Sequence, residues 1–227
     1  MSTKIAMDGK ELTCKLGERV LEVALRNGFN IPTLCYNGLY DENRSGACRL
    51  CIVEVTGGGR VGLHSSCSLP ISSGLQISTK SEAVYQARRT VMELLLSEHT
   101  QDCRNCPTSG ACNFAKYCRD YDLNGVPVCA ECPNQKKACL LSRGVLCLGP
   151  VTYANCNAYC TRRGYRCEGC HSAIGHEAVL KFGLVALRDA GFRPNEILEA
   201  VRVFSLDGAK RIESVMRKMD FVPKEGS

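Results

Sequence analysis

The chain contains 227 residues with a formal net charge of +6, 6% aromatic residues, no Trp and 17 Cys. Apart from the pairs Arg162-Arg163 and Lys136-Lys137, its positive residues are scattered and form no basic stripe interleaved with aromatic residues, which argues against nucleic acid as a partner. A solvated surface or a docking surface for an acidic partner is the alternative for these charges. Few large side chains are available to fill an apolar interior, so ligand bonds to metal are expected to hold the cysteine-rich parts together.

The first 30 residues alternate apolar and polar positions and lack the apolar block and small-residue cleavage site of a secretory signal. The apolar runs are far shorter than the roughly 18 residues of a membrane span. We therefore expect a cytoplasmic protein with no membrane span. Disulfides are rare in that compartment and the number of Cys is odd, so repeated Cys-x2-Cys pairs indicate metal binding rather than a disulfide framework.

The N-terminal region carries the signals of a small α+β domain. Two short runs within residues 4–14 flank the dipeptide Asp8-Gly9, which is typical of a β-hairpin turn. Apolar residues at helical spacing follow over residues 20–25. They stop before Gly28, a residue suited to the end of a helix.

Four cysteines follow this helix with the spacing Cys35-x12-Cys48-x2-Cys51-x15-Cys67. Plant-type [2Fe–2S] sites also place a three-cysteine loop ahead of a distant fourth, and Ser45, Gly46 and Ala47 are small enough to let backbone N–H groups approach the sulfides. A structural zinc is the alternative, although zinc ribbons prefer two Cys-x2-Cys pairs and this region has one. A strand is expected at residues 52–55. Cys14, on the second hairpin strand, is expected to be a buried hydrophobic residue.

The order of turn, helix and cysteines resembles the N-terminal domain of the large iron–sulfur subunit of respiratory complex I. It is also similar to the diaphorase-type iron–sulfur subunits of NAD-linked hydrogenases and to those of iron-only hydrogenases. The resemblance covers roughly the first 120 residues and implies a β-grasp [2Fe–2S] ferredoxin domain over residues 1–80. Its cluster ligands would be Cys35, Cys48, Cys51 and Cys67.

A second group of candidate ligands follows a helix expected from Ser81 to Glu98. It has the form His99-x3-Cys103-x2-Cys106-x5-Cys112, and three thiolates with one imidazole suit zinc or an iron–sulfur cluster. The motif resembles the His-and-three-Cys [4Fe–4S] site of the same subunits, which implies a domain over residues 81–124 with His99, Cys103, Cys106 and Cys112 as ligands. An imidazole makes a cluster less negative and should raise its potential. Cys118 is expected to be a non-ligand.

Eight cysteines lie within residues 125–172, with the spacing Cys129-x2-Cys132-x6-Cys139-x7-Cys147-x8-Cys156-x3-Cys160-x6-Cys167-x2-Cys170. Eight thiolates suit two [4Fe–4S] clusters. The spacing does not reveal which four share a cluster, because in two-cluster ferredoxins a remote cysteine serves the other cluster. Two zinc sites are the alternative and would leave four cysteines unexplained.

The same region resembles the C-terminal part of the small subunit of cytoplasmic [NiFe] hydrogenases of the F420-reducing and sulfhydrogenase kinds. The likeness lies in Cys147-Leu-Gly-Pro-Val-Thr and the four cysteines after it, and it implies a ferredoxin-like two-cluster segment. It departs after Cys170, where those subunits carry Arg-Gly-Pro and this chain has His171-Ser-Ala. No counterpart of their upstream catalytic-pocket part is recognisable, so the chain is not expected to contact a nickel–iron centre.

The last part, residues 173–227, shows apolar residues at helical spacing over 176–190, 194–204 and 206–219. Three short helices are expected, which either wrap the two-cluster segment or dock to a partner. The predicted fold class is therefore α+β: a β-grasp [2Fe–2S] domain, a helical His/Cys3 segment, a two-cluster segment and a small C-terminal helical tail.

Fifteen cysteines and His99 thus form the candidate ligand sets, and no GxGxxG, P-loop or catalytic triad is recognisable. We predict one [2Fe–2S] and three [4Fe–4S] clusters, no catalytic residue, and an electron-transfer subunit that performs no substrate chemistry alone. The resemblance implies two partners within an NAD(P)-linked hydrogenase or an electron-bifurcating, ferredoxin-dependent transhydrogenase. One is an NAD(P)H-oxidising subunit with FMN and iron–sulfur clusters, and the other is a hydrogenase, another redox subunit or ferredoxin. A structural zinc-binding scaffold subunit and a self-sufficient iron–sulfur enzyme are the alternatives.

Overall fold

The computed structural model describes residues 2–36, 46–99, 102–104, 106–123, 125–134 and 138–222. The chain divides into two compact units, unit 1 over residues 1–97 and unit 2 over residues 98–227, and each is described by itself. Across these described ranges, no helix combines the length and apolar character that a membrane span requires.

Unit 1 begins with the predicted hairpin. Strands β1 (Ser2–Met7) and β2 (Lys10–Lys15) pair antiparallel. Asp8 and Gly9 between them have φ angles of 48° and 81°, the left-handed conformations that a tight hairpin turn requires. The Asp8 carboxylate also accepts a hydrogen bond from the backbone N–H of Thr79 at 2.7 Å, which ties the turn to the end of the domain.

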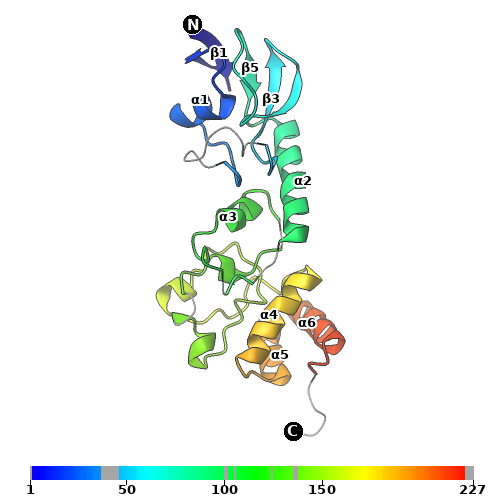
Figure 1. Cartoon of the computed structure of the whole chain (residues 1–227). Coiled ribbons are helices and arrows are strands. Elements are labelled where there is room, and N and C mark those ends of the chain that lie inside the picture. The colour runs from blue at the N-terminus through cyan, green and yellow to red at the C-terminus, as the bar shows by residue number, and fades with distance from the viewer. Residues whose placement is uncertain are drawn as a thin grey trace. The chain divides into compact units, whose positions relative to one another are not determined.

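The hairpin extends into a five-stranded mixed sheet with the order β2-β1-β5-β3-β4 (Figure 1). The other strands are β3 (Ile52–Gly57), β4 (Gly62–Ser65) and β5 (Gln76–Ser78), and β5 runs parallel to β1. Helix α1 (Val20–Arg26) buries four apolar side chains in the same core as the strands. The expected hairpin, helix and strand are thus confirmed, and Cys14 is 3% exposed within this core, as predicted.

Helix α2 (Glu82–Glu98) confirms the helix expected before His99. Its first turn is capped by Ser81, whose hydroxyl oxygen accepts the N–H of Val84 at 3.3 Å. The buried side chain of Arg88 donates to the Ile52 carbonyl oxygen from Nε at 3.0 Å and from Nη2 at 2.6 Å. These bonds fasten the helix to the strand that directly follows the Cys-x2-Cys pair of unit 1.

Unit 2 combines irregular chain with helices. Its described elements are α3 (Asn113–Asp120), the single 3-10 turns η2 (Val128–Ala130), η4 (Leu141–Arg143) and η5 (Thr161–Arg163), and then α4 (Glu177–Asp189), α5 (Pro194–Arg202) and α6 (Leu206–Lys218). The last three confirm the predicted C-terminal helices. They share one apolar core with the cysteine-rich segment, so the expected packing onto that segment is confirmed, whereas docking to a partner stays a prediction.

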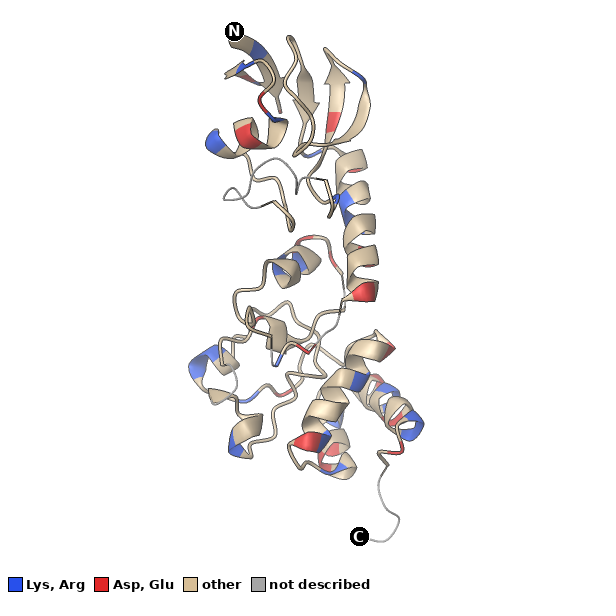
Figure 2. Ribbon diagram, viewed as in Figure 1, with Lys and Arg blue, Asp and Glu red and all other residues tan. Residues whose placement is uncertain are grey.

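The turns η4 and η5 are copies of one local structure, twenty residues apart. Each ends on a left-handed glycine, Gly144 at φ 72° and Gly164 at φ 81°, and each glycine precedes a cysteine by three residues, Cys147 and Cys167. The N–H groups of the two glycines close the turns with equal distances of 3.1 Å to the carbonyl oxygens at their starts. Both turns carry Lys or Arg colouring in Figure 2.

The centre of unit 2 is a buried stretch without helix or strand, residues 148–154, which we term the central segment. Its peptide groups bond to chain on both sides of it. The bonds run from Val128 N to Thr152 O, Ala154 N to Val126 O, Leu148 N to Cys167 O, Tyr153 N to Ser172 O and Ile174 N to Val151 O, at 2.8–3.1 Å. The central segment therefore connects the chain before Cys129 to the chain after Cys170.

Helix α4 lies directly against this segment at Gly183. A Cβ added at Gly183 would come within 2.3 Å of the Pro150 carbonyl oxygen, so only glycine allows this approach of helix to backbone. Leu180, Leu184 and Leu187 are fully buried on the same helix. The C-terminal helices thus form one wall of the core that holds the cysteine-rich segment.

Candidate metal centres

The first set, Cys35, Cys48, Cys51 and Cys67, comes together in unit 1. The backbone N–H of Cys48 donates to Cys35 Sγ at 3.5 Å, and the thiols of Cys51 and Cys67 are hydrogen bonded to each other. Burial, followed by the neighbouring Cys51 thiol, raises the pKa of Cys67 to about 12. The structure therefore brings these four side chains together, which a role as ligands requires.

Backbone N–H groups surround this set. Burial acts to raise the pKa of the Cys48 thiol, but N–H donors, led by that of Leu50, outweigh burial and lower the pKa overall. The N–H of Gly46 donates to the Cys67 sulfur, and Gly46 adopts a φ of 94° that favours glycine. Such N–H donors to sulfur help to set the potential of a cluster. Ser45, one of the small residues singled out in the sequence, lies outside the described residues.

The second set lies at the start of α3. His99 directly follows α2, and its ring stacks on that of Phe114 with centroids 4.4 Å apart and an interplanar angle of 15°. Phe114 lies two residues after Cys112, which is the N-cap of α3. Burial first, and then the nearby thiols of Cys112 and Cys106, raises the pKa of Cys103 to about 12. His99 and the three cysteines are thus neighbours in unit 2.

Cys118 also lies beside this set, which the sequence did not indicate. It is 1% exposed on the buried side of α3. Burial, and then the thiols of Cys112 and Cys103, raises its pKa to about 12. Cys118 falls outside the family motif, so only the fold could reveal its position.

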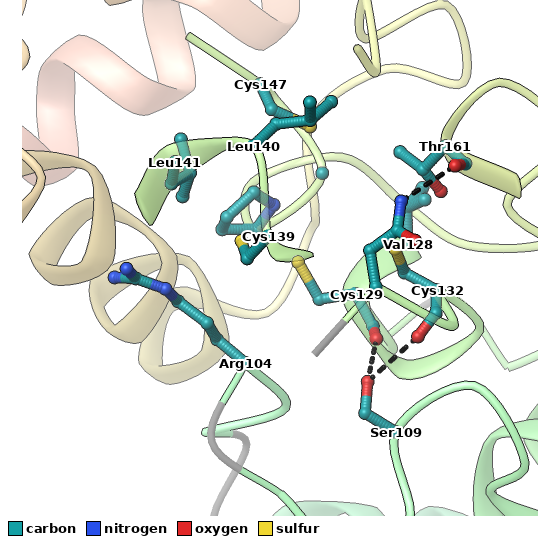
Figure 3. A pocket seen from close by; sticks show the side chains of 13 residues that line it. Arg104, Ser109, Val128, Cys129, Cys132, Cys139, Leu140, Leu141, Cys147 and Thr161 are labelled. Carbon is teal, nitrogen blue, oxygen red and sulfur yellow. Dashed lines mark hydrogen bonds between the residues drawn. The ribbon is translucent and has the colours of Figure 1, made fainter. Parts of the chain in front are cut away.

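The third set consists of the first four of the remaining eight cysteines, which line one pocket in unit 2 (Figure 3). They are Cys129, Cys132, Cys139 and Cys147. In Figure 3 the Cys129 sulfur is directed toward Cys139. A Cβ at Gly149 would lie 3.4 Å from Cys129 Sγ and 3.6 Å from Cys147 Sγ, so the glycine keeps the space beside these sulfurs open. Burial, and then the Cys147 thiol, raises the pKa of Cys129 well above its ordinary value.

The fourth set, Cys156, Cys160, Cys167 and Cys170, surrounds η5 in the sequence. Burial raises the pKa of Cys167 to about 12, although the N–H of Gly169 donates to its sulfur and opposes that shift. Cys147 of the third set and then Cys156 are neighbours that also raise it. Cys156 and Cys160 are half-buried. Cys170 is exposed, and it is the only one of the 17 cysteines in that state. The fourth set is therefore the one with an exposed cysteine, and the second set also has an exposed member, His99.

The loops of the second and third sets are in direct contact. The Ser109 hydroxyl donates to the carbonyl oxygens of Cys129 and Cys132, the latter at 3.3 Å (Figure 3). The N–H of Gly110 donates to the Ala130 carbonyl oxygen at 3.0 Å, and a Cβ on Gly110 would lie 2.8 Å from the Cys132 carbonyl oxygen. No side chain could be accommodated there without moving one ligand loop away from the other.

The third and fourth sets are also in contact. The N–H of Cys167 donates to Cys147 Sγ at 3.3 Å, so the backbone of one set bonds to the sulfur of the other. The N–H of Leu148 returns a hydrogen bond to the Cys167 carbonyl oxygen at 2.9 Å. The three sets of unit 2 thus follow one another through two direct contacts, in the order second, third, fourth.

A buried carboxylate joins all three sets. Glu131 lies in the first Cys-x2-Cys pair of the third set and is 5% exposed. It accepts a hydrogen bond from Arg119 Nη1 of α3 at 2.7 Å, and from the N–H groups of Asn155 at 3.4 Å and Ala158 at 3.2 Å, which flank the start of the fourth set. Asn155 and Ala158 have φ angles of 105° and 48°, conformations that non-glycine residues adopt rarely. The sequence did not predict this structural role for Glu131, because a charged residue between two cysteines is typical of an exposed loop.

These arrangements fit iron–sulfur clusters by their donor chemistry. Converging thiols, N–H groups aimed at sulfur and a glycine beside the pocket of the third set are features that such groups use. Among the described residues, no three His, Cys, Asp or Glu side chains lie close enough to hold a single metal ion.

The sheet and the cysteine spacing are those of an iron–sulfur domain in the N-terminal part of the chain. Residues 1–82 match the family described as 2Fe-2S iron-sulfur cluster binding domain. Residues 88–127 match the NADH-ubiquinone oxidoreductase-G iron-sulfur binding region. The expected [2Fe–2S] domain and the [4Fe–4S] region after it are thereby confirmed, together with their likeness to complex I.

Three curated proteins illustrate the relationship. The chain is 38% identical over 126 residues to the NADP-reducing hydrogenase subunit HndD of Solidesulfovibrio fructosivorans, covering 54% of this chain and 21% of that protein. It is 34% identical over 123 residues to the gamma subunit of the NAD-reducing hydrogenase HoxS of Cupriavidus necator, covering 54% of this chain and 50% of that protein. It is 30% identical over 118 residues to the mitochondrial NADH-ubiquinone oxidoreductase 78 kDa subunit of Candida albicans, covering 52% of this chain and 16% of that protein.

The chain thus spans half or less of the length of these relatives, and the relationship concerns its N-terminal half. The matched families end at residue 127. The likeness of residues 129–170 to [NiFe] hydrogenase small subunits therefore stays a prediction, as do the four segment boundaries and the ligand roles of the sixteen residues.

Replacement of Glu131 by Ala should destabilise unit 2. The variant leaves the Arg119 guanidinium and two backbone N–H groups without their buried acceptor, at a cost of about 2–3 kcal/mol. Thermal unfolding of the anaerobically purified chain should show a lower midpoint and earlier loss of visible absorbance.

The matched control is Glu168→Ala. Glu168 pairs with Arg166 at 2.7 Å, but its side chain is 45% exposed, and such a surface pair contributes about 0–1 kcal/mol. Equal midpoints for the two variants would contradict the role given to Glu131.

Proposed function

We propose that the chain is an electron-transfer subunit that carries electrons between an NAD(P)H-oxidising flavoprotein subunit and a second redox partner. That partner would be a hydrogenase, another redox subunit or ferredoxin, within an NAD(P)-linked hydrogenase or a bifurcating transhydrogenase. The observation that carries the proposal is the pair of direct contacts joining the second set to the third and the third to the fourth. Homology of the N-terminal half to subunits of NAD(P)-linked hydrogenases and complex I supports it.

The proposed ligands are the sixteen residues of the four sets. The first set, Cys35, Cys48, Cys51 and Cys67, would hold a [2Fe–2S] cluster, and His99, Cys103, Cys106 and Cys112 would hold a [4Fe–4S] cluster. Two further [4Fe–4S] clusters are assigned to Cys129, Cys132, Cys139 and Cys147 and to Cys156, Cys160, Cys167 and Cys170. This division into consecutive sets rests on the common pocket of the first four and on the neighbourhood of Cys156 and Cys167.

The bound clusters would supply reversible one-electron chemistry. The residues of the chain hold them, exclude water and stabilise their negative charge. The N–H groups of Gly46, Gly149 and Gly169 donate to sulfur in three different sets. The hydrogen bonds of Ser109 and Gly110 keep neighbouring ligand loops in contact, and short separations favour electron transfer because its rate falls steeply with distance.

Metal content tests the function against its rival, a structural zinc scaffold. The anaerobically purified chain is expected to be brown and to contain about 14 iron atoms with a similar amount of acid-labile sulfide. A flavin-containing, NAD(P)H-oxidising subunit should copurify from the native source. A colourless chain with about four zinc ions would support the scaffold instead.

Replacement of His99 by Ala should alter one [4Fe–4S] centre and no other. Loss of the imidazole removes the only non-thiolate ligand candidate, so one electron paramagnetic resonance signal should disappear or shift while the [2Fe–2S] signal remains. In the His99→Cys variant the centre should persist with a lower potential, because a thiolate adds negative charge.

The control for this experiment is His171→Ala, since His171 is exposed and belongs to no ligand set. Its signals should match those of the unmodified chain. Unchanged signals in the His99→Ala chain would show that His99 is not a ligand.

Paired cysteine variants test how the last eight cysteines are shared. Cys139→Ser with Cys147→Ser changes one set, so about four iron atoms should be lost. Cys139→Ser with Cys160→Ser changes both sets, and about eight should be lost. Iron analysis of the two double variants and of each single variant tests this assignment. If Cys147 instead served the cluster of the fourth set, the Cys139→Ser, Cys147→Ser variant would also lose about eight iron atoms.

A further inference from the structure

The fourth set is where unit 2 exposes a sulfur ligand candidate. Cys170 is exposed, and the loop that joins Cys160 to Cys167 is exposed over residues 162–166. We propose that this loop is the docking surface for an acidic redox protein, which exchanges electrons with the chain at the fourth set. The proposal rests on the proposed function and deepens it by assigning the partner's surface and charge. We term residues 159–166 the exit loop.

The exit loop carries an uncompensated positive charge. Arg162 donates to the carbonyl oxygens of Asn157 at 2.7 Å and Glu131 at 2.9 Å, and Arg163 donates to the Tyr159 carbonyl oxygen at 3.3 Å. Carbonyl oxygens orient a guanidinium without neutralising it. Within the part of the chain that the structure describes, no carboxylate lies within ion-pair distance of either arginine.

One carboxylate lies close by in the sequence. Glu168 pairs with Arg166 at 2.7 Å, and both side chains are about half exposed. Three arginines against one glutamate leave a net charge of +2 between residues 155 and 171. In Figure 2 the η5 turn is coloured for Lys and Arg. Such a surface attracts an acidic partner and increases the rate of encounter at low salt.

Two tyrosines give the same loop an apolar contact area. Tyr159 is 58% exposed and Tyr165 is 69% exposed. The Arg163 guanidinium lies over the Tyr159 ring, with its central carbon 3.7 Å from the ring centroid, so both side chains are held in place before a partner arrives. Tyr and Arg are enriched at protein interfaces and among the residues that contribute most to binding, and side chains ordered in advance lose less entropy on binding.

The chemical step is the transfer of one electron without a proton. A reduced cluster held by the fourth set would lose one electron and the oxidised acidic partner would gain it, or the reverse. A positive loop could also serve only to offset the negative charge of a bound cluster. That alternative predicts a change in cluster potential and no effect on binding, so the two are separable.

The test uses the full chain, purified anaerobically with its clusters, and a small acidic ferredoxin as the probe. Binding of labelled ferredoxin is followed by fluorescence anisotropy at about 20 mM and about 300 mM salt, because screening at the higher salt should weaken an interaction between opposite charges. The Arg163→Glu variant should bind at least about fivefold more weakly at low salt, and the difference should shrink at high salt.

Arg202→Glu is the matched control, because Arg202 is an exposed residue of α5 and undergoes the same change of charge. Its binding should stay within about twofold of the unmodified chain. The second-order rate constant for electron exchange with the ferredoxin should be lowered by Arg163→Glu and nearly unchanged by Arg202→Glu. Exchange with cytochrome c, a basic carrier, should not be slowed by Arg163→Glu.

Equal binding by Arg163→Glu and Arg202→Glu, with all cluster signals intact, would refute the docking surface and leave the proposed function standing. A change confined to the potential of one centre would also refute docking and assign the loop to charge compensation. Absence of iron–sulfur signals from residues 125–172 in the unmodified chain would refute the cluster assignment and the docking surface together.

Discussion

Unit 2 depends on one constraint: the peptide groups of a buried stretch with no helix or strand must find hydrogen-bond partners elsewhere in the chain. The central segment, residues 148–154, satisfies this constraint through bonds to residues 126–128, 167 and 172–174. Residues 126–128 precede the third set, Cys167 belongs to the fourth set, and residues 172–174 follow it. Because Gly183 lets α4 rest directly on the Pro150 carbonyl, a helix that holds no ligand candidate supports the segment that lies between the third and fourth sets.

Burial of the thiols has a second consequence for the protein. The pKa values of Cys67, Cys103 and Cys167 are raised to about 12, chiefly by burial, so without metal these groups are neutral thiols at pH 7. A metal-bound cysteine is a thiolate, and metal binding therefore releases protons and contributes to folding. This contribution suits a chain with few aromatic residues, in which ligand bonds can replace part of the apolar core.

Elements formed by neighbouring residues could be predicted from the sequence, whereas contacts between segments distant in the sequence could not. Asp8-Gly9 predicted the hairpin because the turn requires left-handed residues, and helical spacing predicted α1, α2 and α4 to α6. Strands β4 and β5 were not predicted because they are too short to show a period. Helix α3 was not predicted because it buries only Ala115 and Cys118, which are too few to give an apolar periodicity. The common pocket of Cys129 to Cys147, the position of Cys118 and the buried contacts of Glu131 depend on segments distant in sequence meeting in space, which spacing alone does not reveal.

The η4 and η5 turns repeat one design: a tight turn, a left-handed glycine, and a cysteine whose sulfur receives the N–H of a glycine two residues later. Because the two copies bond to each other at Cys147 and Cys167, the step from one copy to the next is fixed by local geometry. Both turns leave residues at the surface, 142–145 and 162–166. Because a left-handed glycine sets each turn, the exposed side chains of either copy can change without moving the cysteine that follows it.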